Sequence, residues 1–324
     1  MIRVGIVGMG FMGGVHLRNW QSVDGAAVVA VCDANPIAGV AKAGNLDFDE
    51  EELNLDGVAI YTDVAEMLAK ENLDAVSIAL PTHLHKAISI QCLEADIHVL
   101  CEKPMALNVP DCDAMIAAAA QAGKQLMVAH CVRFWPEYAW TRQVVESGKY
   151  GKVLAANFSR LSFPPDGDSW FSDPSKSGGI SLDLHIHDLD FIQYLFGVPK
   201  SARSAHALFG NGVPGHVLTT LDYGDDRAIS ALASWMMPKS FGFKMAFEII
   251  LEKAALVLDS QSETPLRVYP SDGESFVPEL EEGDGYKGEI EYFYNLVAGT
   301  NTKTVITPEQ ARESVRMALE TVKC

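Results

Sequence analysis

Short apolar segments alternate with segments of helical character over about the first 130 residues, and this alternation restricts the fold more than any other feature. Strands are predicted at residues 3–10, 27–33, 75–81, 98–103 and 125–130. Helices are predicted at residues 11–22, just after Pro36, and near 63–71, 84–95 and 110–122. Strands that are apolar on both faces and alternate with helices indicate a parallel, doubly wound α/β sheet.

A glycine motif lies where the first strand meets the first helix: Gly8, Gly10 and Gly13 have G-x-G-x-x-G spacing. In that context Gly8 permits a tight turn, Gly10 lets a pyrophosphate approach the backbone, and Gly13 lets helix and strand pack closely. Asp33 ends the second strand, where a carboxylate can accept hydrogen bonds from ribose hydroxyls and would repel a 2′-phosphate. No basic residue follows Asp33 before Lys42. The motif therefore predicts NAD rather than NADP as the cofactor.

The pattern changes from about residue 150 to longer strands joined by turns, and two helices are predicted to close the chain. Residues 221–235 and 245–260 are each predicted to form a hairpin, the second turning at Glu252-Lys253. A chain of 324 residues exceeds the usual size of a single core. We predict a Rossmann domain over residues 1–130 that binds NAD. An α+β domain with an open, mostly antiparallel sheet over residues 131–324 is predicted to bind the substrate.

Charge and composition exclude several classes of protein. The formal net charge is −18, from 43 acidic and 25 basic residues, whereas sequence-independent binding of nucleic acid needs a basic face. No run of about eighteen uncharged apolar residues occurs, so no membrane span is predicted. The N-terminus enters a strand at once, which leaves no room for a signal peptide. Six scattered cysteines without C-x-x-C spacing indicate a reducing compartment, and we expect a cytoplasmic protein.

A second informative stretch, ISLDLHIHDLDFIQYLF, is predicted to be helical over residues 181–196. On such a helix Asp183 and His187 share a face, Asp190 lies one further turn along, and His185 points roughly to the opposite side. Alone, this pattern fits an ordinary helix whose His187 is hydrogen-bonded to a neighbouring aspartate.

Lys103 changes that interpretation, because it stands at the carboxyl end of a predicted parallel strand, where open α/β sheets bind their ligands. Hydride transfer from an alcohol needs a base for the hydroxyl proton, a cation beside the oxygen and a carboxylate to orient them. Lys103, Asp183 and His187 supply these three groups.

The chain resembles the glucose–fructose oxidoreductase/inositol dehydrogenase (Gfo/Idh/MocA) family over nearly its whole length. The resemblance rests on GIVGMGFMGGVH at the start, PTHLH at 81–85, CEKPMAL at 101–107, RFWP at 133–136 and GGISLDLHIHDLD at 178–190. It implies that Lys103, Asp183 and His187 are the catalytic residues. The predicted cofactor-binding residues are Gly8, Gly10, Phe11, Met12, Gly13, Asp33, Pro81, His85, Glu102 and Lys103.

The resemblance also implies that the Lys103-Pro104 bond is cis and that this turn lies against the nicotinamide. Arg133 and His16 match family positions, although packing or a place near a helix end explains them equally well. Many relatives have glycine where this chain has His185, which leaves open whether His185 contacts substrate or packs.

Trp170, beside Asp166 and Asp168, is the aromatic residue from which we predict a substrate contact, because aromatic rings stack on sugars. No metal site is predicted. His185 and His187 diverge by about 200° on a helix and cannot chelate from one face. His83 and His85 have no third ligand at a suitable spacing.

We predict an NAD-dependent dehydrogenase that oxidises a secondary hydroxyl of a sugar, a sugar derivative or an inositol. Two alternatives stay open: redox-assisted cleavage of a glycoside with tightly held NAD, and a non-catalytic sensor of NAD and sugar. An open antiparallel sheet would expose an apolar face. We therefore expect a homodimer or homotetramer that assembles through the C-terminal sheet.

Overall fold

The computed structural model describes residues 1–35, 37, 53–165, 170–301 and 303–322, which fall into two compact units. Unit 1 comprises Met1–Cys131 and Asp284–Arg312, and unit 2 comprises Val132–Gly283 and Glu313–Cys324. The first division lies close to the predicted domain boundary after residue 130. Residues 284–312, however, group with unit 1 and not with the C-terminal domain as predicted.

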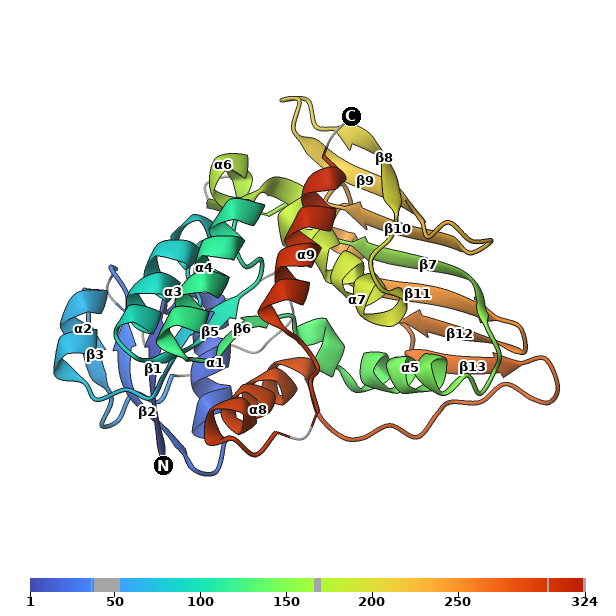
Figure 1. Cartoon of the computed structure of the whole chain (residues 1–324). Helices are drawn as coiled ribbons and strands as arrows, with labels where there is room; N and C mark the ends of the chain where they lie inside the picture. Colours follow the sequence, from blue (N-terminus) through green and yellow to red (C-terminus); the bar gives the residue numbers. More distant parts are fainter. Residues whose placement is uncertain (36, 38–52, 166–169, 302, 323–324) are drawn as a thin grey trace. The chain divides into compact units, whose positions relative to one another are not determined.

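Unit 1 contains a six-stranded sheet in the order β3-β2-β1-β4-β5-β6, with all neighbours parallel (Figure 1). Its strands are β1 (Ile2–Val7), β2 (Ala26–Cys32), β3 (Ala59–Tyr61), β4 (Ala75–Ile78), β5 (His98–Glu102) and β6 (Leu126–Ala129). The predicted parallel, doubly wound sheet is confirmed. Strand β3 was not predicted, because it is only three residues long.

The strand order reverses between β1 and β4, and ligands of open α/β sheets bind beside such a reversal, at the carboxyl ends of the strands. The glycine loop follows β1, Pro81 follows β4 and Lys103 follows β5. Because these strands are neighbours and parallel, the three segments lie along one edge of the sheet.

The helices of unit 1 are α1 (Phe11–Gln21), α2 (Val64–Lys70), α3 (His85–Glu94), α4 (Val109–Ala122) and α8 (Gly285–Ala298). Helix α4 has Asn108 as its N-cap and ends at Gly123, whose φ of 64° is left-handed. Helix α8 packs on α1, where the rings of Trp20 and Phe293 meet edge to face with centroids 6.2 Å apart. This contact explains why residues 284–312 belong to unit 1. The predicted helix after Pro36 lies outside the described residues.

Unit 2 contains a seven-stranded sheet in the order β13-β12-β11-β7-β10-β9-β8 (Figure 1). Its strands are β7 (Val153–Leu161), β8 (Ser201–Leu208), β9 (Pro214–Asp222), β10 (Ala228–Ser234), β11 (Lys244–Leu251), β12 (Ala254–Asp259) and β13 (Leu266–Pro270). Only the β7–β10 pair is parallel among these neighbours, so the mostly antiparallel sheet is confirmed. Both predicted hairpins form, as β9–β10 and β11–β12.

One face of this sheet is covered by α5 (Pro136–Ser147) and α7 (Ile186–Phe196) through aromatic rings. Tyr138 of α5 contacts Phe191 of α7 and Phe247 of β11, with ring centroids 4.8 and 5.4 Å apart. Phe158 of β7 joins the same cluster, and all four rings are buried. Such packed rings contribute more than their buried area alone.

Two further helices belong to the fold, α6 (Pro174–Ser177) and α9 (Pro308–Glu320). Helix α9 begins with a capping box, in which Thr307 Oγ1 accepts from the Gln310 N–H at 3.2 Å. Gln310 Oε1 in turn accepts from the Thr307 N–H at 3.3 Å. Among the described residues, no helix has both the length and the apolarity that a membrane span requires.

Candidate functional site

The three glycines of the motif meet different surroundings. A Cβ on Gly8, whose φ is +90°, would lie 2.4 Å from the Ala79 carbonyl oxygen, and one on Gly13 would lie 1.9 Å from the Gly8 oxygen. Gly8 and Gly13 are therefore required by the close packing of β1, β4 and α1. A Cβ on Gly10 would have no atom within 4 Å. The backbone at Gly10 thus borders open space, as the approach of a pyrophosphate requires.

Helix α1 starts at this open space. Gly10 is its N-cap and supplies no side-chain cap to the first turn, which begins with the half-buried Phe11 and Met12. The partial positive charge of a helix N-terminus attracts phosphate. The glycine loop and α1 therefore fit the phosphates of NAD.

Asp33 lies beside the glycine loop. Its Oδ2 accepts a hydrogen bond from the Met9 N–H at 2.7 Å, and its Oδ1 accepts one from the Asn35 N–H at 2.8 Å. The carboxylate is half-buried and so remains accessible in part. It has the position that an acid binding the adenosine ribose needs. Lys42, on which the preference for NAD over NADP partly depended, lies outside the described residues.

The turn after β5 is fixed by the Glu102 carboxylate. Oε1 accepts from His16 Nε2 at 3.0 Å, and Oε2 accepts from the Lys103 N–H at 2.9 Å. Burial raises the pKa of Glu102, but the hydrogen bond from His16 and the charge of Lys103 outweigh it and leave the pKa below its usual value. Glu102 is thus an ionised carboxylate. The Lys103-Pro104 bond is cis, as the resemblance implied.

His85 connects this turn to the segment after β4. Its Nδ1 lies 2.8 Å from the Pro104 carbonyl oxygen and its Nε2 lies 2.7 Å from that of Leu80. The ring is fully buried, and burial lowers its pKa. His85 therefore has a structural role next to the half-buried Pro81, while direct contact with the cofactor stays a prediction.

Asp183 and His187 belong to unit 2, where a π-helical turn, Ser181–His185, runs into α7. Such turns are rare and occur often at functional sites. Over residues 181–190, Asp183 and His187 are partly exposed and all the others are buried. The two predicted catalytic residues therefore share one side of the helix.

His185 faces the other way. It is fully buried, and its Nε2 lies 2.9 Å from Thr219 Oγ1 on β9. Burial, with the nearby His206 and Arg160, lowers the pKa of His185 to about 3, so the ring is neutral. Packing accounts for His185 without a substrate contact.

Two buried ion pairs, made by aspartates that follow His187, fix the rotation of α7. Arg160 binds Asp188 through Nε and Nη2 at 3.1 and 2.9 Å, and Arg133 binds Asp190 through the same two atoms at 2.8 Å each. Forked contacts of this kind fix orientation as well as distance. Asp190, predicted one turn beyond His187, is fully buried and does not share its partial exposure.

Trp170 lies in a short 3₁₀ turn, Trp170–Ser172, and its ring stacks on Phe171 with centroids 3.9 Å apart. It is half-buried, so part of the ring is accessible. Asp166 and Asp168 lie outside the described residues. A substrate contact from Trp170 stays a prediction.

One cluster was missed in the sequence. Among the described residues, His16, Glu102 and Glu289 form the one group of three His, Cys, Asp or Glu side chains with nitrogen or oxygen atoms within 4.8 Å of one another. All three are buried in unit 1. Glu289 is far from the other two along the chain and carried no motif that could have marked it.

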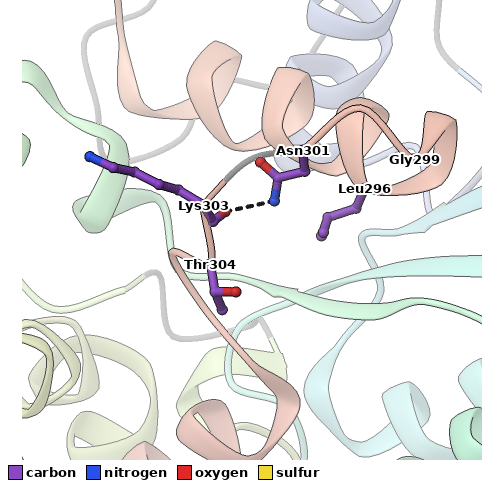
Figure 2. Close-up of a pocket in the computed structure, with 5 residues that line it drawn as sticks. All are labelled: Leu296, Gly299, Asn301, Lys303 and Thr304. Carbon is purple, nitrogen blue, oxygen red and sulfur yellow. Dashed lines mark hydrogen bonds between the residues drawn. The ribbon is translucent and has the colours of Figure 1, made fainter.

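A surface pocket lies at the end of α8 and is lined by Leu296, Gly299, Asn301, Lys303 and Thr304 (Figure 2). The Asn301 side chain donates a hydrogen bond to the Lys303 carbonyl oxygen at 2.7 Å (Figure 2). None of these residues belongs to the predicted site, and the pocket has no assigned role.

Comparison with known proteins identifies both parts of the chain. Residues 2–130 match an oxidoreductase family with an NAD-binding Rossmann fold, and residues 138–257 match the GFO/IDH/MocA C-terminal domain. A myo-inositol 2-dehydrogenase from Thermotoga maritima is 28% identical over 337 residues, covering 98% of this chain and 93% of that protein.

Two other proteins are similar in part of their sequence or in fold. A 2,7-anhydro-N-acetylneuraminate hydratase from Mediterraneibacter gnavus is 34% identical over 194 residues, which are 59% of this chain and only 48% of that protein. A levoglucosan dehydrogenase solved in complex with NADH has a TM-score of 0.83 at 20% identity, covering 99% of this chain and 96% of that chain. At this identity the likeness shows the fold alone.

The glycine geometry predicts that one alanine substitution weakens NAD binding and another lowers stability. Gly10→Ala places a methyl group in open space, so thermal unfolding should be unchanged while the Kd for NAD rises at least about tenfold. Gly13→Ala forces a methyl group against the Gly8 oxygen and should lower the unfolding temperature by several degrees. Calorimetry and NADH fluorescence titration measure both. Unchanged NAD affinity in Gly10→Ala would remove the glycine loop from the cofactor site.

Proposed function

We propose, on the premise that the chain belongs to the Gfo/Idh/MocA family of NAD-dependent oxidoreductases, that it oxidises a secondary hydroxyl of a sugar, sugar derivative or inositol. The observation that carries the proposal is the shared, partly exposed side of Asp183 and His187 on a helix that is otherwise buried over residues 181–190. A dehydrogenase needs such an accessible base, and a helix that only packs does not.

The roles of the residues follow from their chemistry. NAD, when bound, supplies the acceptor for the hydride. The glycine loop holds the phosphates and Asp33 holds the ribose. His187 takes the hydroxyl proton, Lys103 stabilises negative charge developing on the substrate oxygen, and Asp183 orients the hydroxyl or the imidazole.

The substrate class rests on the relatives. The myo-inositol dehydrogenase matches almost the whole chain and is named for a cyclic polyol, and the levoglucosan dehydrogenase is named for a sugar derivative. We extend the class, and not either individual substrate, to this chain. We also keep a cytoplasmic location as a proposal, which the free, buried thiols of the five described cysteines support.

A second candidate is a reaction without net redox change, in which hydride leaves the substrate and later returns to it. The relative from M. gnavus favours this candidate, because it is named a hydratase and the addition of water involves no net oxidation. The same base, cation and carboxylate could start either reaction. Net formation of NADH separates the two.

The face of the unit 2 sheet opposite α5 and α7 supports a proposal of self-association. Leu218 on β9, Ile250 on β11 and Tyr269 on β13 are 42%, 42% and 46% exposed on this sheet. Such side chains, repeated across a sheet, favour burial against another surface. We propose a homodimer or homotetramer that assembles through this face.

The proposed reaction predicts that inositols or aldoses reduce NAD when the protein is added, measured as NADH absorbance. NADP should serve poorly, because Asp33 repels its 2′-phosphate. Glycosides that are cleaved or hydrated without net NADH would support the redox-neutral candidate. No turnover of polyols, sugars or glycosides would contradict both.

Lys103→Met should lower kcat by about a thousandfold, because the developing charge on oxygen loses its cation, while the Kd for NAD stays nearly unchanged. Lys70→Met is the matched control, since Lys70 is an exposed lysine on α2 that pairs with Glu66. Steady-state kinetics and NADH titration give both quantities. Undiminished turnover in Lys103→Met would exclude Lys103 from the mechanism.

Light scattering at micromolar concentration should give a mass above that of one chain. Ile250→Lys should shift it toward the monomer, because a charge cannot be buried unpaired in an interface. Val198→Lys is the control, since Val198 is 50% exposed and lies outside the sheet. A monomeric wild-type protein would refute the proposed association.

A further inference from the structure

Glu289 on α8 is a fully buried carboxyl group without a visible partner. Its exposed fraction is 0%, and neither carboxyl oxygen has a hydrogen-bond partner among the described residues. An ionised carboxylate in such surroundings is strongly unfavourable, and the group protonates instead. Burial without a hydrogen-bond partner therefore favours the neutral, protonated form of Glu289.

The neighbours of Glu289 also favour its protonated form. One oxygen of Glu289 lies within 4.8 Å of an oxygen of Glu102 and of a ring nitrogen of His16. Glu102 uses both oxygens as acceptors, toward His16 and the Lys103 N–H, and is the ionised member. Burial raises the pKa of Glu289 well above its usual value, and the charges of Glu102 and Asp284 add to the effect. Two carboxyl groups this close share one negative charge.

We propose that Glu289 is a positioning residue for Lys103, acting as a neutral carboxylic acid behind Glu102. While Glu289 keeps its proton, Glu102 carries the only negative charge of the pair and holds the backbone N–H of Lys103. Loss of that proton places two negative charges in one buried site and drives Glu102 from its position. This inference rests on the proposed role of Lys103 in the reaction.

The charged and titratable groups around Glu289 come from several elements of unit 1. Helix α1 contributes His16, β5 contributes Glu102, and Asp284 caps α8 itself. Lys103, in the turn after β5, acts on Glu102. His85 of α3 acts on Glu102, and its pKa is lowered by burial. Asp284 and Glu102 both oppose ionisation of Glu289, so Glu289 keeps its proton well above the pH at which an ordinary carboxyl group loses it.

The sign of the pH effect follows from linkage. A carboxyl group with a raised pKa in the folded protein binds its proton more tightly there than in the unfolded chain. Its contribution to stability is present at acidic pH and is lost as pH rises toward the folded pKa. The stability contribution should therefore fall between the unfolded and the folded pKa, whereas turnover should fall only as the folded protein loses the proton. A side chain that cannot ionise should abolish both declines.

A divalent cation bound by His16, Glu102 and Glu289 is the competing explanation. The hydrogen bonds disfavour it, because His16 Nε2 points at Glu102 Oε1 and Glu102 Oε2 already holds a backbone N–H. A cation bound between His16 Nε2 and Glu102 Oε1 would have to replace their hydrogen bond. Metal analysis of the purified protein decides this point.

The test compares Glu289→Gln with Glu291→Gln, an exposed glutamate two positions along the same helix. Near neutral pH, Glu289→Gln should keep kcat within about threefold of wild type, and its loss of kcat at alkaline pH should move upward by about one pH unit or more. The infrared band of a protonated carboxylic acid should be present in wild type and absent from Glu289→Gln. Glu291→Gln should match wild type in both. Glu289→Met replaces the glutamine variant if a buried amide prevents folding.

An alkaline limb of kcat that is the same in wild type and Glu289→Gln would overturn the proposal, as would the absence of the infrared band from wild type. A stoichiometric metal that is lost in Glu289→Gln would overturn it too. Failure of the proposed function is a separate result, since it appears as no turnover of polyols, sugars or glycosides, whereas the infrared band requires no turnover. Full activity of Lys103→Met would remove only the role of Lys103.

Discussion

The contact that the rest of unit 1 depends on is the close approach of β1, β4 and α1 at the glycine loop. There is no space for even a methyl group on Gly8 or Gly13, and this tightness brings the start of α1 against the ends of two neighbouring strands. The open space at Gly10 exists because its neighbours in the motif are packed so closely. Binding and packing are thus two results of one backbone arrangement.

In unit 2, Asp183 and His187 are held partly exposed on a helix that is otherwise buried over residues 181–190. The pairs Arg160–Asp188 and Arg133–Asp190 set the rotation of α7. The π-helical turn before α7 carries Asp183. Buried ion pairs contribute little net stability, but leaving one partner unpaired is costly. They therefore restrict the helix to one orientation more than they stabilise it.

Much of this arrangement was predictable because local sequence determined it. The glycine spacing and the hairpins depend on neighbouring residues, and the structure agrees with both. The rest depends on contacts between distant segments. No local pattern marks Glu289 as a neighbour of Glu102, and the exposure of Asp190 could not be distinguished from that of His187 without its partner Arg133.

Unit 1 is built from two separate stretches of the chain, and this affects how it folds during synthesis. Residues 1–131 leave the ribosome long before residues 284–312. During that time the first stretch lacks α8, which covers Trp20. Contacts between residues so far apart in sequence form slowly and leave apolar surface uncovered meanwhile. The nascent Rossmann sheet is therefore complete in its strands but lacks part of its cover until nearly the whole chain has been made.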